Sequence, residues 1–183
     1  MAFLSGTASI RALELDTASI AVKPAKHIGI GTTGLGKGLL MNRNLVAKSS
    51  VLINAPTDKV WNALVTPAAV KEYMFGTNVA SDWKEGSPIT WKGEWEGKSY
   101  EDKGVIVRIN KGETLQYTHF SPLAGLPDKP ENYHTVTIDL ARKGAQTEVS
   151  LAQDNNTTEE DRAHSEKNWQ TMLTGLKKYV EKG

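Results

Sequence analysis

Histidine is the side chain best suited to acid–base chemistry near neutral pH, and this sequence contains four: His27, His119, His134 and His164. No two of them have the close spacing of zinc ligands, and no His-Glu-x-x-His pair is present. Cysteine is absent, which excludes thiolate metal sites, disulfides and cysteine nucleophiles. The sequence therefore predicts neither a metal site nor an organic cofactor, and it assigns no catalytic residue.

Two of these histidines, His119 and His134, fall in strand-like segments. If the strands face the interior, either imidazole would lie among Tyr117, Trp91 and Trp169, where it could act as an acid, a base or a hydrogen-bond donor to a ligand. The alternative is a histidine at the end of a strand that bonds to the backbone or to water, and we favour this alternative. No Gly-x-Ser-x-Gly elbow is present, which argues against an esterase.

Large apolar side chains are the other candidates, because small-molecule cavities are lined mainly by apolar and aromatic residues with a few polar groups. Ordinary core packing explains each of them equally well, since burying a large aromatic side chain contributes about 2–3 kcal/mol without a ligand. Asp102 is expected on the solvent-facing side of its strand, and the position of Gln153 is left open between the two faces. The candidate cavity residues are Trp61, Tyr73, Met74, Phe75, Trp91, Trp95, Tyr117, His119, His134, Gln153, Trp169, Met172, Leu173 and Leu176.

The overall composition narrows the class of protein. A chain of 183 residues fits one domain with its own hydrophobic core. Its formal net charge is +1 and its charges are interleaved, which argues against a nucleic-acid surface or a polybasic membrane patch. No apolar run approaches the roughly 18 residues of a transmembrane helix. We expect a soluble cytoplasmic protein with no nucleic-acid partner and no membrane span.

Residues 1–40 differ from the rest of the chain in composition. Ser, Thr, Ala and Gly dominate this segment, and its apolar residues keep no sustained period. We expect a poorly ordered extension here, followed by one domain over residues 41–183. Glu14 and Asp16 interrupt the segment that a secretory signal would need, and Met41 is an alternative start of the chain.

One part of this extension has the glycine spacing of a phosphate-binding loop. Residues 31–37 match that loop up to its lysine, but Gly38 replaces the Ser or Thr that would hold magnesium. No convincing strand precedes the segment. We therefore favour a flexible glycine linker over a nucleotide site.

The element that must position the candidate residues is a long helix over residues 157–182. Its apolar residues follow the i, i+3, i+4, i+7, i+11 spacing of one helix face: Trp169, Met172, Leu173, Leu176 and Val180. Thr157 and Glu160 fit a capping box at its start. Such a helix is long enough to cross a whole face of a small domain.

Upstream of this helix, alternation and turn residues predict strands over residues 44–54, 78–81, 87–96, 98–109, 114–121, 132–142 and 147–153. Two short helices separate the first two strands; Pro56 introduces one and Pro67 the other. Tight turns with glycine join later strands into an antiparallel meander. Val105, Val107 and Ile109 share one face, which we expect to pack on the helix. The sequence predicts an α+β fold in which a curved antiparallel sheet of about seven strands wraps around a long C-terminal helix.

This order of elements, together with particular residues, resembles the START-like helix-grip superfamily, also called SRPBCC, and within it the heat-shock-protein-90 ATPase activator homologue-like family. The resemblance covers residues 44–181. It is carried by Ala55-Pro56, Val60-Trp61, Pro67, Tyr73, Gly76, Gly104, Leu115-Gln116-Tyr117 and the stretch from Glu166 to Tyr179 with Trp169, Leu173 and Leu176. It implies a cavity between sheet and helix that can hold an apolar small molecule.

We therefore expect a binding protein for a small hydrophobic or amphipathic ligand, which His119, Tyr117 or Gln153 would orient. One alternative is a cyclase- or dehydratase-like enzyme that uses the cavity histidines. The other is a co-factor protein of the heat-shock-protein-90 chaperone, with a role in the stress response. Chaperone-activating relatives carry an additional amino-terminal domain, and the residues before Met41 are too few for one. A binding protein is favoured over an enzyme.

Overall fold

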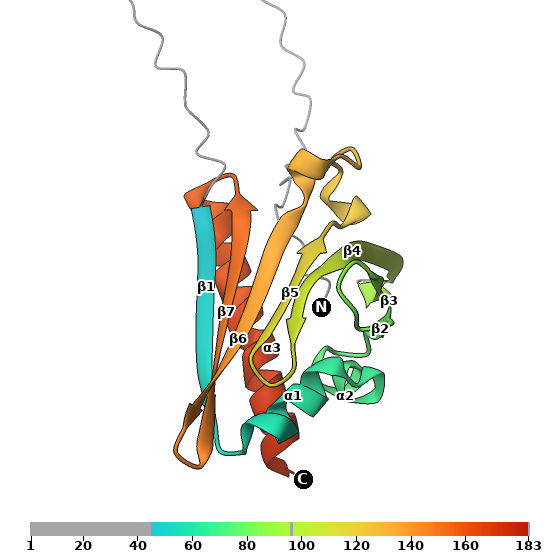
Figure 1. Cartoon of the computed structure of the whole chain (residues 1–183). Coiled ribbons are helices and arrows are strands. Elements are labelled where there is room, and N and C mark those ends of the chain that lie inside the picture. The colour runs from blue at the N-terminus through green and yellow to red at the C-terminus, as the bar shows by residue number, and fades with distance from the viewer. Residues whose placement is uncertain (1–44, 96, 183) are drawn as a thin grey trace, which may run out of the picture.

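Helix α3 (Glu159–Lys182) is the element that the sheet encloses in the computed structural model, which describes residues 45–95 and 97–182 (Figure 1). Its buried side chains form the predicted stripe, joined by one polar residue: Ser165, Trp169, Met172, Leu173, Leu176 and Val180. Among the described residues, no helix combines the length and apolar composition needed to span a membrane. The expectations for residues 1–40, including the resemblance to a phosphate-binding loop, lie outside the described residues.

The start of α3 lies one residue later than the predicted capping box. Thr158 Oγ1 accepts a hydrogen bond from the backbone N–H of Asp161 at 3.0 Å, and the Thr158 carbonyl accepts one from Arg162. Thr158 is therefore the capping residue in place of Thr157, and Asp161 takes the third helical position that the prediction assigned to Glu160. The prediction was wrong because two adjacent threonines are equally good caps by type.

The seven strands form one antiparallel sheet in the order β1-β7-β6-β5-β4-β3-β2. Strands β2 to β7 follow one another as a meander, and the first strand of the chain pairs with the last. Their bounds are β1 (Leu45–Ile53), β2 (Asn78–Ser81), β3 (Pro88–Trp95), β4 (Lys98–Asn110), β5 (Thr114–His119), β6 (His134–Lys143) and β7 (Gln146–Asn156). The predicted α+β helix-grip fold is confirmed.

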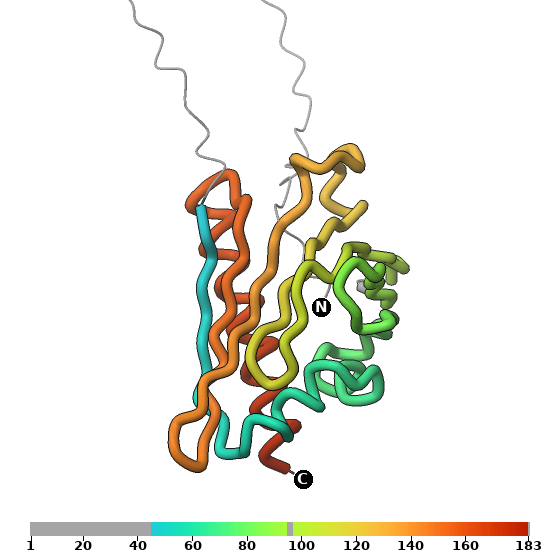
Figure 2. Tube along the Cα trace, viewed as in Figure 1, coloured from blue at the N-terminus to red at the C-terminus, as the bar shows by residue number. Residues whose placement is uncertain are grey.

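Two short helices, α1 (Thr57–Val65) and α2 (Pro67–Tyr73), connect β1 to β2, as predicted. Figure 2 shows the backbone passing from β1 into this pair, which lies beside the C-terminal half of α3. Gly175 of α3 permits the close approach of α2, because a Cβ atom there would lie only 2.8 Å from the carbonyl oxygen of Tyr73.

The face assignment of strand β4 differs from the prediction. Val105 and Val107 are 42% and 46% exposed, whereas Ile106 between them is fully buried. The pairing of β4 with β5 has a register irregularity between Ile106 and Arg108, after which Ile109 packs against the core. An extra residue in a strand moves all side chains beyond it to the other face. The prediction assumed that the alternation ending at Ile109 also held before the irregularity. It was therefore wrong for Val105 and Val107, which face solvent.

Gly104 allows β4 to cross closely beside β5. A Cβ atom at this position would lie 1.6 Å from the carbonyl oxygen of Thr118, closer than any real carbon–oxygen contact. On either side of it, Lys103 bonds with Phe120 through the backbone, and the Val105 N–H donates to Thr118 Oγ1 at 2.9 Å. Strand β4 can therefore keep its hydrogen bonds to Thr118 and Phe120 only if residue 104 is glycine.

We predict that Gly104→Ala lowers the free energy of unfolding by at least about 2 kcal/mol, because the added methyl group must push backbone against backbone. Chemical denaturation followed by circular dichroism measures the change. Val107→Ala, at an exposed position of the same strand, is the control and should shift stability by less than about 1 kcal/mol. Equal losses in the two variants would contradict the close-approach argument.

Candidate functional site

A buried hydrogen-bonded pair of side chains, Asp102 and His119, lies on the inner face of the sheet, between β4 and β5. Asp102 Oδ2 lies 3.1 Å from His119 Nε2, and the two side chains are among the buried polar residues of the chain. The indole of Trp91 contacts the imidazole edge-on, with ring centroids 5.2 Å apart. The ring of Tyr117 contacts the same indole, with ring centroids 5.0 Å apart. The carboxylate therefore orients the imidazole within an aromatic wall.

The second oxygen of this carboxylate has no hydrogen-bond partner among the described residues. Asp102 is only 2% exposed, and its Oδ1 atom is fully buried. Leaving a buried acceptor unpaired costs about 1–3 kcal/mol, and more for a charged group. Such an atom marks a position where a bound molecule with a donor group would be stabilised. The expectation of a solvent-facing Asp102 was wrong, because it assumed that a carboxylate in a half-exposed strand takes the wet face, whereas Asp102 shares the inner face with Tyr100 and Ile106.

The interior beside this pair holds two small voids. One, of about 10 Å³, is bounded by Asp102, His119 and Tyr100 together with aromatic rings. The other, of about 30 Å³, is apolar and lies towards α1 and α2. Each has room for about one or two water molecules at most. Four of the predicted cavity residues line both voids: Met74, Trp91, Tyr117 and Trp169.

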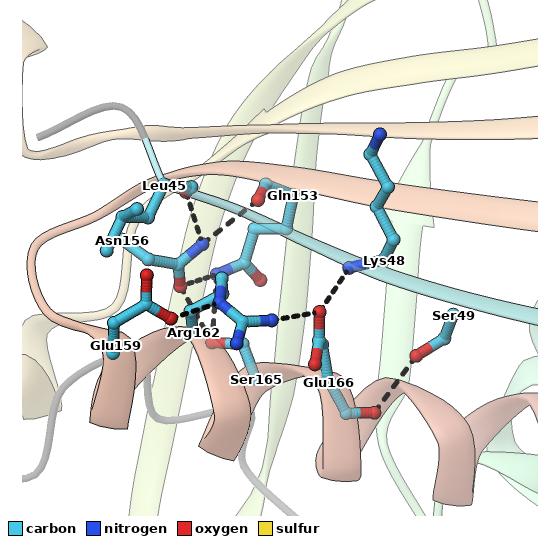
Figure 3. A network of polar contacts seen from close by, with 9 residues as sticks. All are labelled: Leu45, Lys48, Ser49, Gln153, Asn156, Glu159, Arg162, Ser165 and Glu166. Carbon is cyan, nitrogen blue, oxygen red and sulfur yellow. Dashed lines mark hydrogen bonds and ion pairs between the residues drawn. The ribbon is translucent and has the colours of Figure 1, made fainter.

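Gln153 lies at the centre of a second polar cluster, which joins β7 to α3 (Figure 3). Its Oε1 accepts from the Trp169 indole N–H at 2.7 Å, and its Nε2 donates to Ser165 and Asn156 at 3.2 Å each. Asn156 continues the chain of bonds to the Leu45 carbonyl of β1 at 2.9 Å. Gln153 is 3% exposed, so the open question of its face is answered: it points inward.

His134 lies directly opposite His119 in the pairing of β5 and β6. Its Nδ1 atom donates to the backbone carbonyl of Asp154 at 2.8 Å. Burial lowers the pKa of this imidazole below its ordinary value, and the bond to Asp154 opposes that shift without reversing it. His134 is therefore a neutral, backbone-bonded histidine at neutral pH, whereas His119 bonds to a carboxylate.

The remaining candidate residues divide between the core and the surface. Trp61 and Met172 are buried, as are Leu173 and Leu176. Burial raises the pKa of the Tyr73 and Tyr117 hydroxyls, so both stay protonated. Phe75 is 55% exposed and lies outside the core, and the side chain of Trp95 lies outside the described part of the chain.

Sequence reasoning missed the role of three polar residues around the smaller void. They are Asp102, Tyr100 and Thr77, of which the last two share a hydrogen bond of 2.8 Å between their hydroxyl oxygens. The available signal was the alternation of Tyr100, Asp102, Gly104 and Ile106 on one face. Within residues 45–95 and 97–182, no group of three or more His, Cys, Asp or Glu side chains could hold a metal ion.

Comparison with known proteins gives one family and many similar folds. Residues 54–181 match the family model described as Activator of Hsp90 ATPase homolog 1-like protein. A protein from Cytophaga hutchinsonii, with a solution structure, is 60% identical; the match covers 78% of this chain and 97% of that one, with a TM-score of 0.69. No curated protein matches the sequence significantly.

Two more distant structures share the fold alone. A crystal structure of a protein from Mesorhizobium loti is 17% identical, covers 75% of this chain and 98% of its own, and has a TM-score of 0.62. The solution structure of the Aha1 dimer from Colwellia psychrerythraea is 21% identical, with 75% and 96% coverage and a TM-score of 0.59.

Replacing Gln153 by Leu should lower the free energy of unfolding by about 2–4 kcal/mol, because buried donors and acceptors around it lose their partner. Thermal and urea denaturation measure the loss. Gln170→Leu, on the exposed face of α3, is the matched control, with an expected change within about 0.5 kcal/mol. If both variants are equally stable, Gln153 does not tie the helix to the sheet.

His134 should make stability depend on pH. Its pKa in the folded state is lowered from 6.5, so the unfolded chain binds a proton more readily. The contribution of His134 is therefore present above about pH 6.5 and is lost as pH falls below it. His134→Gln should flatten the decline in urea midpoint between neutral and mildly acidic pH. An unchanged slope in the variant would assign the decline to other groups.

Proposed function

The chain belongs to the family of Activator of Hsp90 ATPase homolog 1-like proteins, and from this premise we propose that it binds a small hydrophobic or amphipathic molecule between its sheet and helix α3. The observation that supports the proposal is the Asp102 Oδ1 atom, a buried carboxylate oxygen without a partner among the described residues. It lies in a wall of aromatic side chains, the kind of lining that small-molecule sites use.

The chemistry of this wall selects a ligand with a largely apolar body and one donor group. Trp91, Tyr117 and Trp169 offer apolar and aromatic surface. A hydroxyl or N–H group of the ligand would complete the hydrogen bonding of Asp102, whose other oxygen is engaged by His119. An entirely apolar molecule would leave the carboxylate oxygen unpaired and would bind less well.

Ligand binding must expand the interior, because the two voids are far smaller than the 300 Å³ or more typical of small-molecule sites. The side chain that best permits expansion is Met74, which lines both voids and has an adaptable thioether chain. It ends α2 and precedes Phe75 and Gly76, two residues with positive φ. Movement of this connection would join the two voids into one cavity.

A second candidate function is acid–base catalysis at the same pair, in a cyclisation or dehydration. The observation that favours it is the contact of 3.1 Å between Asp102 and His119. A carboxylate that accepts from Nε2 holds the imidazole in one tautomer and leaves Nδ1 to exchange a proton with a ligand. Once a ligand is identified, its conversion by the wild type and not by His119→Gln would establish catalysis.

A third candidate function is contact with an Hsp90 chaperone, supported by the family description. A cytoplasmic location and a role in the stress response would follow from it. The test is a pull-down of the host Hsp90 with the full chain. Retention of the chaperone would support this role, and its absence at high protein concentration would argue against it.

Native mass spectrometry of the full chain, purified gently from its host, tests the ligand proposal. We expect a stoichiometric small molecule that denaturation releases. Asp102→Asn should lower its occupancy by about tenfold, because a hydrogen bond to a charged acceptor is lost. Asp139→Asn, at an exposed position of β6, is the matched control and should retain the ligand.

Either of two results would overturn this proposal. The first is a protein that carries no small molecule from its host and takes up none from a lipid extract. The second is equal occupancy in the wild type and Asp102→Asn, with both folded by circular dichroism. The second result would place the ligand away from the unpaired carboxylate oxygen.

A further inference from the structure

An open groove of about 700 Å³ lies outside the core, between α1, α2 and the C-terminal half of α3. Figure 2 shows these three helices gathered at the end of the sheet near the C-terminus. The groove is more than ten times larger than either interior void and is separate from the Asp102–His119 pair. Its size falls in the range of small-molecule sites.

The floor of this groove is apolar, and two exposed aromatic rings flank it. Ala63, Ala69 and Val180 are buried residues that line it. Phe75 and Tyr179 also line it and are 55% and 39% exposed, so two aromatic rings lie beside the buried floor. The groove therefore offers apolar surface that residues 45–95 and 97–182 leave uncovered.

The backbone holds Phe75 at the rim in an unfavourable conformation. Its φ is +54°, in the left-handed region, at the position after α2 where helices usually carry glycine. Gly76 follows with φ +89°, and its N–H donates to the Lys71 carbonyl at 2.8 Å to close the helix end. A non-glycine residue in this region costs free energy, so an exposed ring held there points to a binding role.

The charged residues of the groove are mostly basic. Lys59, Lys178 and Lys182 line it, with Glu72 as the one carboxylate. Among the described residues, none of these three lysines forms an ion pair, although their neighbour Lys177 pairs with Glu181. An apolar floor beside unpaired cations is complementary to a molecule that is apolar along its length and anionic at one end.

We propose that this groove binds a small anionic amphiphile, an alkyl chain that ends in a carboxylate. The alkyl chain would lie on the floor between Phe75 and Tyr179, and the carboxylate would be held by Lys178 and its basic neighbours. The proposal concerns a surface site and does not depend on ligand binding in the core.

The test uses the full chain labelled with ¹⁵N and decanoate as the probe, below its micellar concentration. Decanoate should shift the amide signals of Ala63, Ala69 and Gly175, which line the groove. Lys178→Glu should weaken binding by about fivefold, since an exposed charge contact becomes a repulsion. Lys167→Glu makes the same charge change at an exposed position of α3 outside the groove and should bind as the wild type does.

The uncharged probe 1-decanol separates the charge contribution from the apolar one, because its binding should be the same in wild type and Lys178→Glu. Three results would overturn the proposal. They are equal weakening by the two lysine variants, decanoate shifts confined to residues around Trp91 and Tyr117, and groove shifts that depend on protein concentration without any amphiphile. The last result would assign the groove to contact with a second copy of the chain.

Discussion

The close approach of β4 to β5 at Gly104 is the constraint on which the shape of the interior depends. It lets β4 pair with β3 along its first half and with β5 along its second, so the sheet can close around α3. Asp102 and Ile106 lie on the same inward face of β4, on either side of Gly104. The buried Asp102 carboxyl group therefore lies close along the strand to the glycine that permits the bend.

The two polar clusters of the interior differ in how completely their hydrogen bonds are satisfied. Every polar atom of the Gln153 side chain has a partner, and the cluster fixes α3 against β7 and β1. At Asp102, the Oδ2 atom bonds to His119, whereas the Oδ1 atom has no hydrogen-bond partner among the described residues. A void of about 10 Å³ lies beside this carboxyl group. A fully satisfied network stabilises the fold, whereas a buried acceptor without a partner is a local cost that calls for a physical explanation.

Most of the fold could be predicted because the apolar residues recur at the regular spacings of helices and strands. The stripe on α3, the alternation of the strands and the glycine turns each reflect a repeat that the sequence displays directly. Asp102 was expected to face solvent because that is usual for a carboxylate in a half-exposed strand, and its buried contact with His119 has no counterpart in the residue pattern. Phe75 was expected in the core and lies at the surface, because its left-handed backbone is one that residue type does not predict. The aromatic residues around His119 were identified from the sequence, but the way in which their rings pack against one another was not.

Tyr73 belongs to two surfaces at once, since it lines both the outer groove and the larger interior void. The same residue therefore contributes both to a surface groove and to the core. A molecule on either side that displaces this ring changes the surface available on the other. A substitution at Tyr73 would therefore change the outer groove and the interior void together.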